Sequence, residues 1–397
     1  MDHKFGALAI LGGAPAFSQP LHVGRPNIGN VPRFMERVQD ILASGRLTNY
    51  GPYVARFEQR VCELASVKHC VMTCNATMAL SLTANALSLS GSVIVPSFTF
   101  IATAHALQAI GLRVIFADID AHSHQLSMEN LSSSIASDTT AIVAVNLWGM
   151  ASPVKELEQL CARRGLKLIF DSAQAFGATY LGQPFGGFGD AEVFSFHATK
   201  AVNSFEGGAI TTNDSVLADR LRLAINFGFS EEDCISSWGT NAKMTEICAA
   251  MGLTSLEAMD SIFAHNRDIH ARYATHLAEI PGLRLLEYAS DEQSSYNYVV
   301  VVVDDRFVLT RDELFAVLRA ENVLARRYFF PPGHRAEPYR NYSEKTAINL
   351  PVTEEVCRRV ICLPTGTAVA RLDVDRICAI IAQAQAHKDA IRLAISH

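Results

Sequence analysis

Two side chains of this sequence have the types and the setting of a catalytic pair. Asp171 directly follows the hydrophobic run 166–170, and Lys200 lies just beyond a second run, 193–196. Both runs are predicted strands of one parallel sheet, and such sheets bind ligands at the carboxyl ends of their strands. Considered alone, Asp171 could equally cap the next helix, and a single lysine is most often a solvated side chain. Together they place a carboxylate and an amine at one edge of the sheet.

An amine and a carboxylate in this arrangement meet the needs of pyridoxal phosphate. The amine binds the aldehyde of the cofactor, and the acid keeps its pyridine nitrogen protonated, so that the ring accepts electrons. The cofactor also needs a phosphate site. The segment 73–77 lies at a predicted strand-to-helix junction, where free backbone N–H groups and the helix dipole favour an anion. Ser195 could add a hydroxyl group, although a serine in a strand is more often a plain ladder residue.

The elements that must position these residues follow from a regular alternation of patterns. Short runs rich in β-branched residues occur at 70–74, 93–95, 114–117, 141–145, 166–170 and 192–196. Between them, helix-like composition or spacing occurs at 76–89, 102–110, 128–135 and 153–164. The alternation predicts an α/β protein whose mostly parallel central sheet carries helices on both faces.

A second, smaller domain is expected toward the C-terminus. Residues 244–277 have the pattern of a long helical passage, followed by a strand at 296–303 and a helix at 310–321. With 397 residues, the chain has the length of two domains. We therefore expect an N-terminal segment and large cofactor-binding α/β domain at 1–255, and a smaller α+β domain at 256–397.

Composition excludes several classes of protein and partner. Of the 397 residues, 49% are hydrophobic and 19% are charged, which excludes disorder, collagen and a coiled coil as descriptions of the whole chain. The net charge is only −6, and no block of lysine or arginine runs through the sequence. We therefore expect neither nucleic acid nor a membrane surface among its partners.

Cysteine spacing and the length of the hydrophobic runs indicate the cellular compartment of the protein. The nine cysteines form neither CxxC pairs nor the Cys/His spacing of a metal site, so we expect reduced thiols, no metal and a cytoplasmic protein. The apolar stretch 7–11 is interrupted at once by Gly12 and Gly13. No apolar run reaches the roughly 20 residues that a membrane span needs, so we expect neither a signal peptide nor an anchor.

Several separated motifs carry a resemblance to a known family. The chain resembles the sugar aminotransferases of the DegT/DnrJ/EryC1/StrS group, which have the fold type I of pyridoxal-phosphate enzymes. The resemblance runs almost from end to end. Its motifs, in order, are Leu8-Ala-Ile-Leu-Gly-Gly13, Gly45-Arg-Leu-Thr-Asn-Tyr-Gly-Pro52, Val95-Pro-Ser-Phe-Thr-Phe-Ile-Ala-Thr103, Phe170-Asp-Ser-Ala-Gln-Ala175, Phe194-Ser-Phe-His-Ala-Thr-Lys200 and Glu206-Gly-Gly208.

The resemblance implies a role for each matching position around the cofactor ring. Lys200 is similar to the lysine that holds the cofactor as a Schiff base, and Asp171 to the aspartate on the pyridinium nitrogen. Gln174 would lie beside the ring oxygen, and Phe100, which otherwise reads as a core residue, would stack on the ring. Some members of the group are dehydratases with histidine in place of the lysine, so a lysine at this position favours transamination.

The resemblance also implies the phosphate contacts and a partner subunit. The phosphate would be held by Asn75, Ala76, Thr77 and Ser195. Asn241 resembles the asparagine that the neighbouring subunit contributes to the site. It thus implies a homodimer whose active sites lie at the subunit interface.

Within the family, the pattern around the lysine points to a reaction. His197-Ala-Thr-Lys200 followed by Glu206-Gly-Gly208 is most similar to enzymes that aminate C4 of nucleotide-linked 4-keto-6-deoxyhexoses, with dTDP as the expected nucleotide. The usual alternative at the lysine is Tyr-Pro-x-Lys, and its absence favours C4 over C3. The implied donor is L-glutamate, with the cofactor alternating between pyridoxal and pyridoxamine 5′-phosphate in deoxyaminosugar biosynthesis.

A nucleotide diphosphate brings negative charge to a protein of net charge −6, so local cations must bind it. The segment 326–334 combines two arginines, aromatic rings and a rigid turn, although it could equally be a basic turn packed at a domain interface. Glu206 could orient the lysine or a sugar hydroxyl, or be a turn residue. The candidate substrate contacts are Thr48, Asn49, Tyr50, His197, Glu206, Lys243, Arg326, Arg327, Tyr328 and His334.

Three other functions share part of this pattern. An aminocyclitol aminotransferase would have the same cofactor residues and accept a keto-inositol. A dehydratase or desulfurase of the same fold would keep the cofactor without transferring an amino group from glutamate. A non-catalytic pyridoxal-phosphate-binding regulator would need a DNA-binding appendage or a basic patch, and the sequence displays neither.

Overall fold

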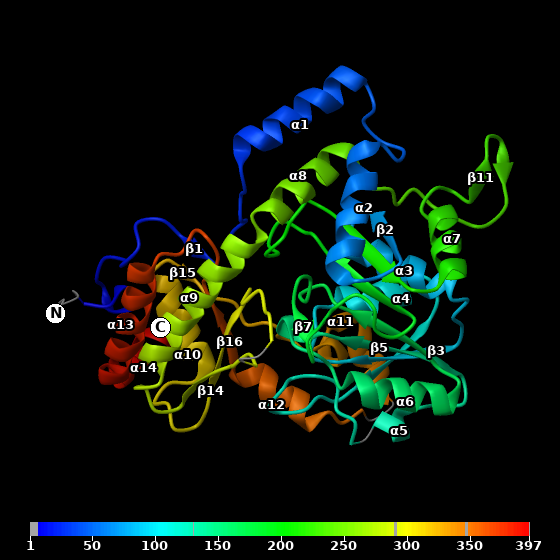
Figure 1. The fold of residues 1–397 in the computed structure, drawn as a ribbon. Coiled ribbons are helices and arrows are strands. Elements are labelled where there is room, and N and C mark those ends of the chain that lie inside the picture. Colours follow the sequence, from blue (N-terminus) through cyan, green and yellow to red (C-terminus); the bar gives the residue numbers. More distant parts are fainter. Residues whose placement is uncertain (1–6, 130, 290–291, 346–347, 397) are drawn as a thin grey trace.

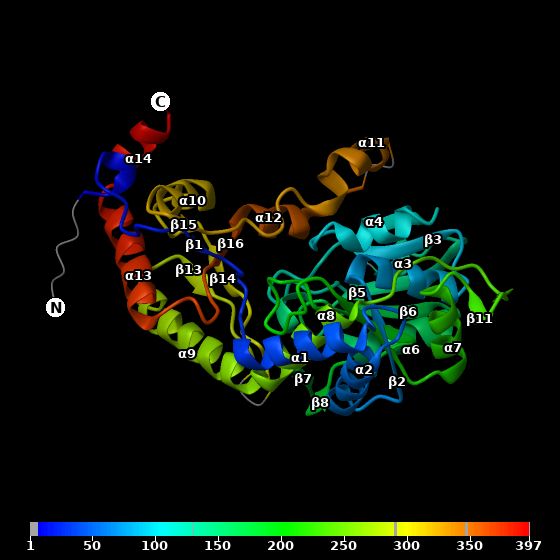
Figure 2. The same cartoon turned by 90° about the horizontal axis from the view of Figure 1, so that it is seen from above.

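The computed structural model describes residues 7–129, 131–289, 292–345 and 348–396. A large α/β region carries a seven-stranded sheet, and a smaller region at one end of the molecule carries a three-stranded sheet (Figures 1 and 2). Helices α8 (Glu246–Glu257) and α9 (Met259–Leu277) lead from the large region into the smaller one, with a bend of 59° between them. Among the described residues, no single helix is both long and apolar enough to cross a membrane.

The large sheet is mixed. In spatial order its strands are β2 (His69–Thr73), β10 (Gly208–Thr212), β9 (Ala191–Ser195), β6 (Lys167–Asp171), β5 (Thr139–Val145), β3 (Ser92–Pro96) and β4 (Arg113–Ala117). β10 is antiparallel to both of its neighbours, whereas the neighbouring pairs from β9 to β4 are parallel. The predicted mostly parallel sheet is confirmed, and β10 is an addition that the sequence pattern did not predict.

Both faces of this sheet are covered by helices because both faces of its strands are apolar. In β5, Ala141 and Val143 pack into one hydrophobic core, and Ile142 and Ala144 pack into another on the opposite face, as in other buried parallel sheets. The helices on one face are α3 (Ala76–Ala86), α4 (Ala102–Gln108) and α7 (Ser215–Ala224), and those on the other are α2 (Pro52–Ala65), α6 (Val154–Arg164) and α8.

The smaller region has its own core. Its strands are β13 (Leu283–Leu285), β14 (Val299–Val303) and β16 (Val360–Leu363), and its helices are α9, α10 (Arg311–Ala320), α13 (Arg371–Ala386) and α14 (Lys388–Ile395). A capping box starts α10, since Thr310 Oγ1 accepts from Glu313 N and Glu313 Oε2 accepts from Thr310 N, at 3.2 and 2.7 Å. Each of these two bonds gives a partner to a backbone N–H group that the helix itself leaves without one.

The N-terminal segment packs against the smaller region. It contains η1 (Ala9–Leu11) and β1 (Leu21–His22), and β1 runs parallel to β15 (Val323–Leu324). Leu8, Phe17 and Leu21 belong to the same hydrophobic core as α9 and α13. The sequence analysis groups an N-terminal segment with the large domain in residues 1–255, and in the structure the first apolar side chains of that segment pack against the C-terminal region. A boundary near residue 255 remains our proposal for the rest of the chain.

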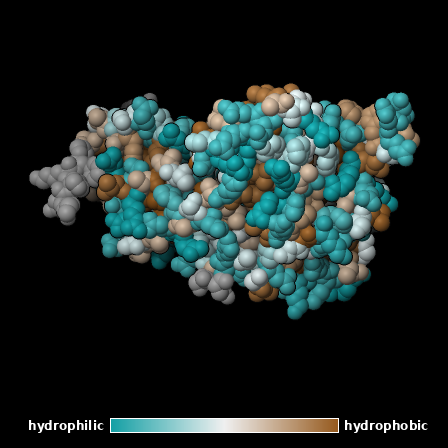
Figure 3. All heavy atoms as spheres, turned by 45° about the horizontal axis from the view of Figure 1, so that its top comes forward, coloured by the Kyte–Doolittle hydropathy of each residue, from teal (hydrophilic) through white to brown (hydrophobic). Residues whose placement is uncertain are grey.

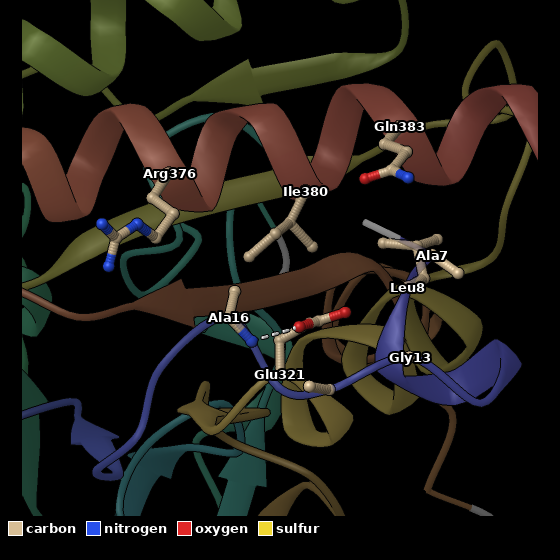
Figure 4. Close-up of a pocket in the computed structure, with 9 residues that line it drawn as sticks. Ala7, Leu8, Gly13, Ala16, Glu321, Arg376, Ile380 and Gln383 are labelled. Atoms are coloured by element: carbon tan, nitrogen blue, oxygen red, sulfur yellow. Dashed lines mark hydrogen bonds between the residues drawn. The ribbon is translucent and has the colours of Figure 1, made fainter. Parts of the chain in front are cut away.

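A buried carboxylate fastens the N-terminal segment. Glu321 follows α10, and its oxygens accept hydrogen bonds from the backbone N–H groups of Ala9 and Ala16, each at 2.7 Å. Figure 4 shows Glu321 directed at this segment, with Arg376 and Gln383 of α13 across a cavity of about 400 Å³. Glu321 thus holds the backbone at both ends of the segment 9–16. Each hydrogen bond to a charged group of this kind contributes about 1.5–3 kcal/mol.

The remaining elements connect the two regions or project from them. They are α1 (Val31–Ser44), α5 (Leu131–Ser134), η2 (Leu147–Gly149), β7 (Thr179–Tyr180), β8 (Gln183–Pro184), β11 (Phe229–Glu231), β12 (Cys234–Ile235), η3 (Gly333–Arg335), α11 (Glu337–Lys345) and α12 (Pro351–Arg359). Helix α1 lies at the surface beside α8, and the β11–β12 hairpin projects from the far side of the large region (Figures 1 and 2).

Candidate active site

A cavity of about 400 Å³ opens at the edge where β6 and β9 end. Asp171 and Lys200 both line it, so the fold brings the two to one place. The cavity also contains most of the other predicted cofactor contacts, namely Asn75, Ala76, Thr77, Phe100, Gln174 and Ser195. Of the predicted substrate contacts it contains His197, Glu206, Arg326 and Tyr328.

Asp171 is the last residue of β6 and is 6% exposed. Thr103 Oγ1 donates a hydrogen bond to its Oδ2 at 2.7 Å, and the N–H of Ala173 donates to its Oδ1 at 3.2 Å. Burial raises the pKa of the Asp171 carboxyl, while these two bonds and the nearby Lys200 amine oppose that change. A cation facing the carboxylate from inside the cavity would offset the cost of burying its charge.

Lys200 lies beyond the end of β9 in a turn closed by its own N–H, which donates to the carbonyl of His197 at 2.9 Å. Burial lowers the pKa of its amine to about 8, and the charge of Asp171 acts in the opposite direction. With this pKa about one amine in ten is a neutral nucleophile at pH 7, a far larger fraction than for an ordinary lysine. The amine therefore suits covalent attachment of an aldehyde.

The N-terminus of α3 supplies an anion site in the same cavity. Asn75 caps the helix by accepting from the N–H of Met78 at 2.9 Å, while Ala76 and Thr77 line the cavity with the first N–H groups of the helix, which have no partner within it. Gly208 of β10 lies against this turn, since a Cβ there would approach Ala76 N to 2.6 Å. A glycine thus lets the strand and the helix end come together.

Aromatic and amide groups form the walls. Phe100 is 59% exposed although it is a large apolar side chain, and it faces the cavity near Phe329, with ring centroids 6.2 Å apart. Gln174 Oε1 accepts from the backbone N–H of Trp148 at 2.6 Å. That bond leaves the amide nitrogen of Gln174 to donate to an oxygen in the cavity. An open aromatic face and an oriented donor complete a lining that fits a flat, phosphorylated ring.

The cavity fits pyridoxal phosphate on its own chemistry. It combines an amine of lowered pKa, a buried carboxylate, an open helix N-terminus and an exposed aromatic ring. Among the described residues, no group of three or more histidine, cysteine or acidic side chains is arranged to hold a metal ion. All nine cysteines are free thiols.

Comparison with known proteins agrees with this chemistry. A model of the DegT/DnrJ/EryC1/StrS aminotransferase family matches residues 30–382. The chain belongs to this family. It is therefore a pyridoxal-phosphate-dependent aminotransferase of fold type I.

Relatives and solved structures match most of the chain. The dTDP-4-amino-4,6-dideoxy-D-glucose transaminase of Shigella dysenteriae is 33% identical, over 87% of this chain and 94% of the relative. The GDP-perosamine synthase of Vibrio cholerae is 32% identical, over 86% and 93%. The crystal structure of DesI in the presence of its TDP-sugar product has a TM-score of 0.94 at 44% identity, covering 98% of this chain and 99% of that one.

Several predicted substrate contacts lie outside this cavity. Thr48 and Asn49 are exposed in the loop before α2. The Tyr50 hydroxyl is bound by Glu58 at 2.9 Å and by Arg222 at 2.6 Å, so it anchors that loop to the core. In this chain, the side chain of Tyr50 is thus engaged in a structural contact.

The remaining basic candidates also have partners of their own. His334 is fully buried, with Nδ1 2.7 Å from Ser97 Oγ and Nε2 3.2 Å from Glu354 Oε1, so it is a packed core histidine. Arg327 pairs with an aspartate of α10 at 2.9 Å. Lys243 donates to an asparagine side chain at 2.7 Å. The sequence did not reveal these pairings because each partner is far along the chain or in another element.

Asn241 is exposed and is not among the residues that line this cavity. Its backbone pairs with Asn226 at the base of the projecting β11–β12 hairpin. The side chain is therefore accessible from outside the chain, as a residue that serves a neighbouring subunit must be.

The structure adds residues to the site that we did not assign from the sequence. Thr103, the last residue of the motif 95–103, binds Asp171. Tyr298 and Phe329 of the C-terminal part line the cavity. In the sequence, Phe329 lies in the segment 326–334 and Tyr298 in the predicted strand 296–303, but tertiary packing alone decides that both reach the cavity.

The low pKa of Lys200 leads to a kinetic prediction. When the protein without cofactor is mixed with pyridoxal phosphate, the rate of covalent attachment should rise with pH and level off above about pH 8, because the neutral amine is the nucleophile. The measurement is the growth of visible absorbance after rapid mixing, from about pH 6 to pH 10.

Butylamine under the same conditions corrects for titration of the cofactor itself, and Lys200→Ala should show no borohydride-stable attachment. A rate that keeps rising to the pKa of an ordinary lysine would contradict the assignment of a desolvated amine.

Proposed function

We propose that the protein transfers an amino group from L-glutamate to C4 of a dTDP-linked 4-keto-6-deoxyhexose. The transfer chemistry rests on one observation, the meeting of Lys200 and Asp171 in a single cavity. The choice of sugar and nucleotide is supported by the names of the dTDP-4-amino-4,6-dideoxy-D-glucose transaminase and of DesI with its TDP-sugar product. The sequence around Lys200 favours the same carbon.

The residues of this chain divide the chemical work. When bound, the cofactor withdraws electrons from the carbon that carries the nitrogen. Asp171 is positioned to pair with the protonated pyridine nitrogen, which keeps that withdrawal strong. Lys200, with a pKa of about 8, is suited to take a proton from the donor carbon and to return it, because general acid–base catalysis is most efficient with a pKa near the working pH.

A histidine and a glutamate beside Lys200 are suited to a polyhydroxylated substrate. His197 Nδ1 lies 2.8 Å from Thr199 Oγ1 and accepts from the N–H of Thr199 at 3.3 Å, so Nε2 takes no part in these contacts. That Nε2 lies 3.6 Å from Glu206 Oε1, and both side chains line the cavity. The pair offers a donor and an acceptor side by side, the combination that a sugar hydroxyl can use.

Arg326 is the basic side chain proposed for the diphosphate. It lines the cavity, is exposed, and has no ion pair with the part of the chain that the structure describes. Tyr328 lines the same wall and could stack on the sugar or the base. An unpaired guanidinium at the mouth of the cavity is suited to bind phosphate oxygens.

We also propose a homodimer with shared sites. Large apolar side chains are exposed on the β11–β12 hairpin and around it, namely Phe227, Phe229, Ile235 and Trp238. Others are exposed on and beside α1, namely Ile28, Val31, Met35, Leu42 and Leu47. Hydrophobic patches are visible between hydrophilic areas on the face drawn in Figure 3. Exposed apolar surface of this kind marks interaction sites, and Asn241 lies at the base of the hairpin.

A substrate panel tests the proposed reaction. The purified protein is incubated with L-glutamate and, in turn, dTDP-linked 4-keto-6-deoxy, dTDP-linked 3-keto and GDP-linked 4-keto-6-deoxy sugars and a keto-inositol, and the product amine is located by NMR. We expect kcat/KM for the dTDP-linked 4-keto sugar to exceed that for the others by about 10-fold or more, since lost polar contacts are costly.

Preferred amination at C3, or of the cyclitol ketone, would contradict the proposed substrate. Consumption of the sugar without transfer of nitrogen from glutamate would instead indicate the dehydratase alternative.

Subunit complementation tests the shared site. Lys200→Ala and Asn241→Ala should each lose activity as homodimers. A purified heterodimer of the two variants should regain about half of the wild-type activity per dimer, because one of its two sites then has both residues intact. If Asn241 served the site of its own chain, both sites would stay defective and no activity would return.

A further inference from the structure

Asp171 receives a hydrogen bond from a residue of helix α4. Thr103 lies in the first turn of α4, is 1% exposed, and donates from Oγ1 to Asp171 Oδ2 at 2.7 Å. A threonine in a helix more often bonds a carbonyl of the preceding turn. Here the hydroxyl proton is given to the carboxylate instead.

This bond is the one side-chain hydrogen bond that Asp171 makes with the described residues. Its other oxygen accepts only the N–H of Ala173, at the longer distance of 3.2 Å. Two donors on different oxygens fix the rotation of the carboxylate. Without Thr103, one oxygen would be left in a buried place with no donor from the protein.

A donor in this position favours one protonation state of the carboxyl group. A hydrogen bond from a hydroxyl stabilises a carboxylate more than a neutral acid, and burial does the opposite. Both effects act on Asp171, because it is buried and also accepts the hydrogen bond from Thr103. Whether a proton shared with a pyridine nitrogen stays on the ring depends on this balance.

We propose that Thr103 is a positioning residue for the aminotransferase reaction: its hydroxyl holds Asp171 ionised and turned toward the cofactor nitrogen. The proposal rests on the cofactor site described above and does not depend on which sugar is the substrate. Thr103 also follows Phe100 by three residues, and Phe100 lines the cavity. The same short segment therefore supplies an aromatic wall and orients the carboxylate.

Substitution of Thr103 separates this role from simple packing. Thr103→Val keeps the shape and removes the hydroxyl, and Thr103→Ser keeps the hydroxyl. Thr83→Val is the matched control, since Thr83 is fully buried in the neighbouring helix α3 and its hydroxyl bonds Ala79 O at 2.8 Å. All are compared as cofactor-loaded proteins.

We expect Thr103→Val to lower kcat for the glutamate half-reaction by about 10- to 100-fold, as the loss of a hydrogen bond to a charged group implies, with KM within about 2-fold of wild type. Its visible absorption band should also change its position or its dependence on pH. Thr103→Ser should restore both properties, and Thr83→Val should leave both unchanged.

Wild-type kcat and wild-type spectra for Thr103→Val would overturn the proposal, as would failure of Thr103→Ser to restore them. If circular dichroism shows that Thr103→Val does not fold, Thr103→Ala is judged by the same two readouts. The spectrum and the glutamate half-reaction need no sugar, so a wrong sugar assignment would leave this test intact.

Discussion

Burying the carboxylate of Asp171 costs free energy, and the rest of the site is arranged around offsetting that cost. The residue ends a central strand and is almost without solvent contact, so its charge depends on what the protein places beside it. Thr103 and Ala173 donate to its two oxygens, and the Lys200 amine attracts it from across the cavity. The same low-polarity setting lowers the pKa of Lys200, so one environment prepares both groups.

The sheet gives this arrangement its rigidity. β6 and β9 are parallel neighbours, so Asp171 and the turn to Lys200 reach the same edge, and β10 brings Gly208 against the N-terminus of α3. The C-terminal part closes the cavity from outside with Arg326 and Tyr328. The large region thus supplies the residues for the cofactor, and the segment with Arg326 and Tyr328 adds a wall of the cavity from the C-terminal part of the chain.

Much of the fold could be predicted because its parallel strands are short, β-branched runs that end in polar residues, as at Asp171. The strand β10 escaped prediction because Gly-Ala-Ile-Thr-Thr has a single strongly hydrophobic side chain and its partners are set by topology. Thr103 could be placed in a motif but not on Asp171, since 68 residues separate them. His334 is a candidate substrate contact in the sequence, and only the packing shows its bonds to Ser97 and Glu354.

The central claim is that Asp171 keeps the pyridine nitrogen of the bound cofactor protonated. The direct measurement is the ¹⁵N NMR chemical shift of pyridoxal phosphate labelled at that nitrogen and bound to the protein near neutral pH. We predict the shift of a protonated nitrogen in the wild type and that of an unprotonated nitrogen in Asp171→Asn. An unprotonated nitrogen in the wild type, or no difference between the two proteins, would contradict the account.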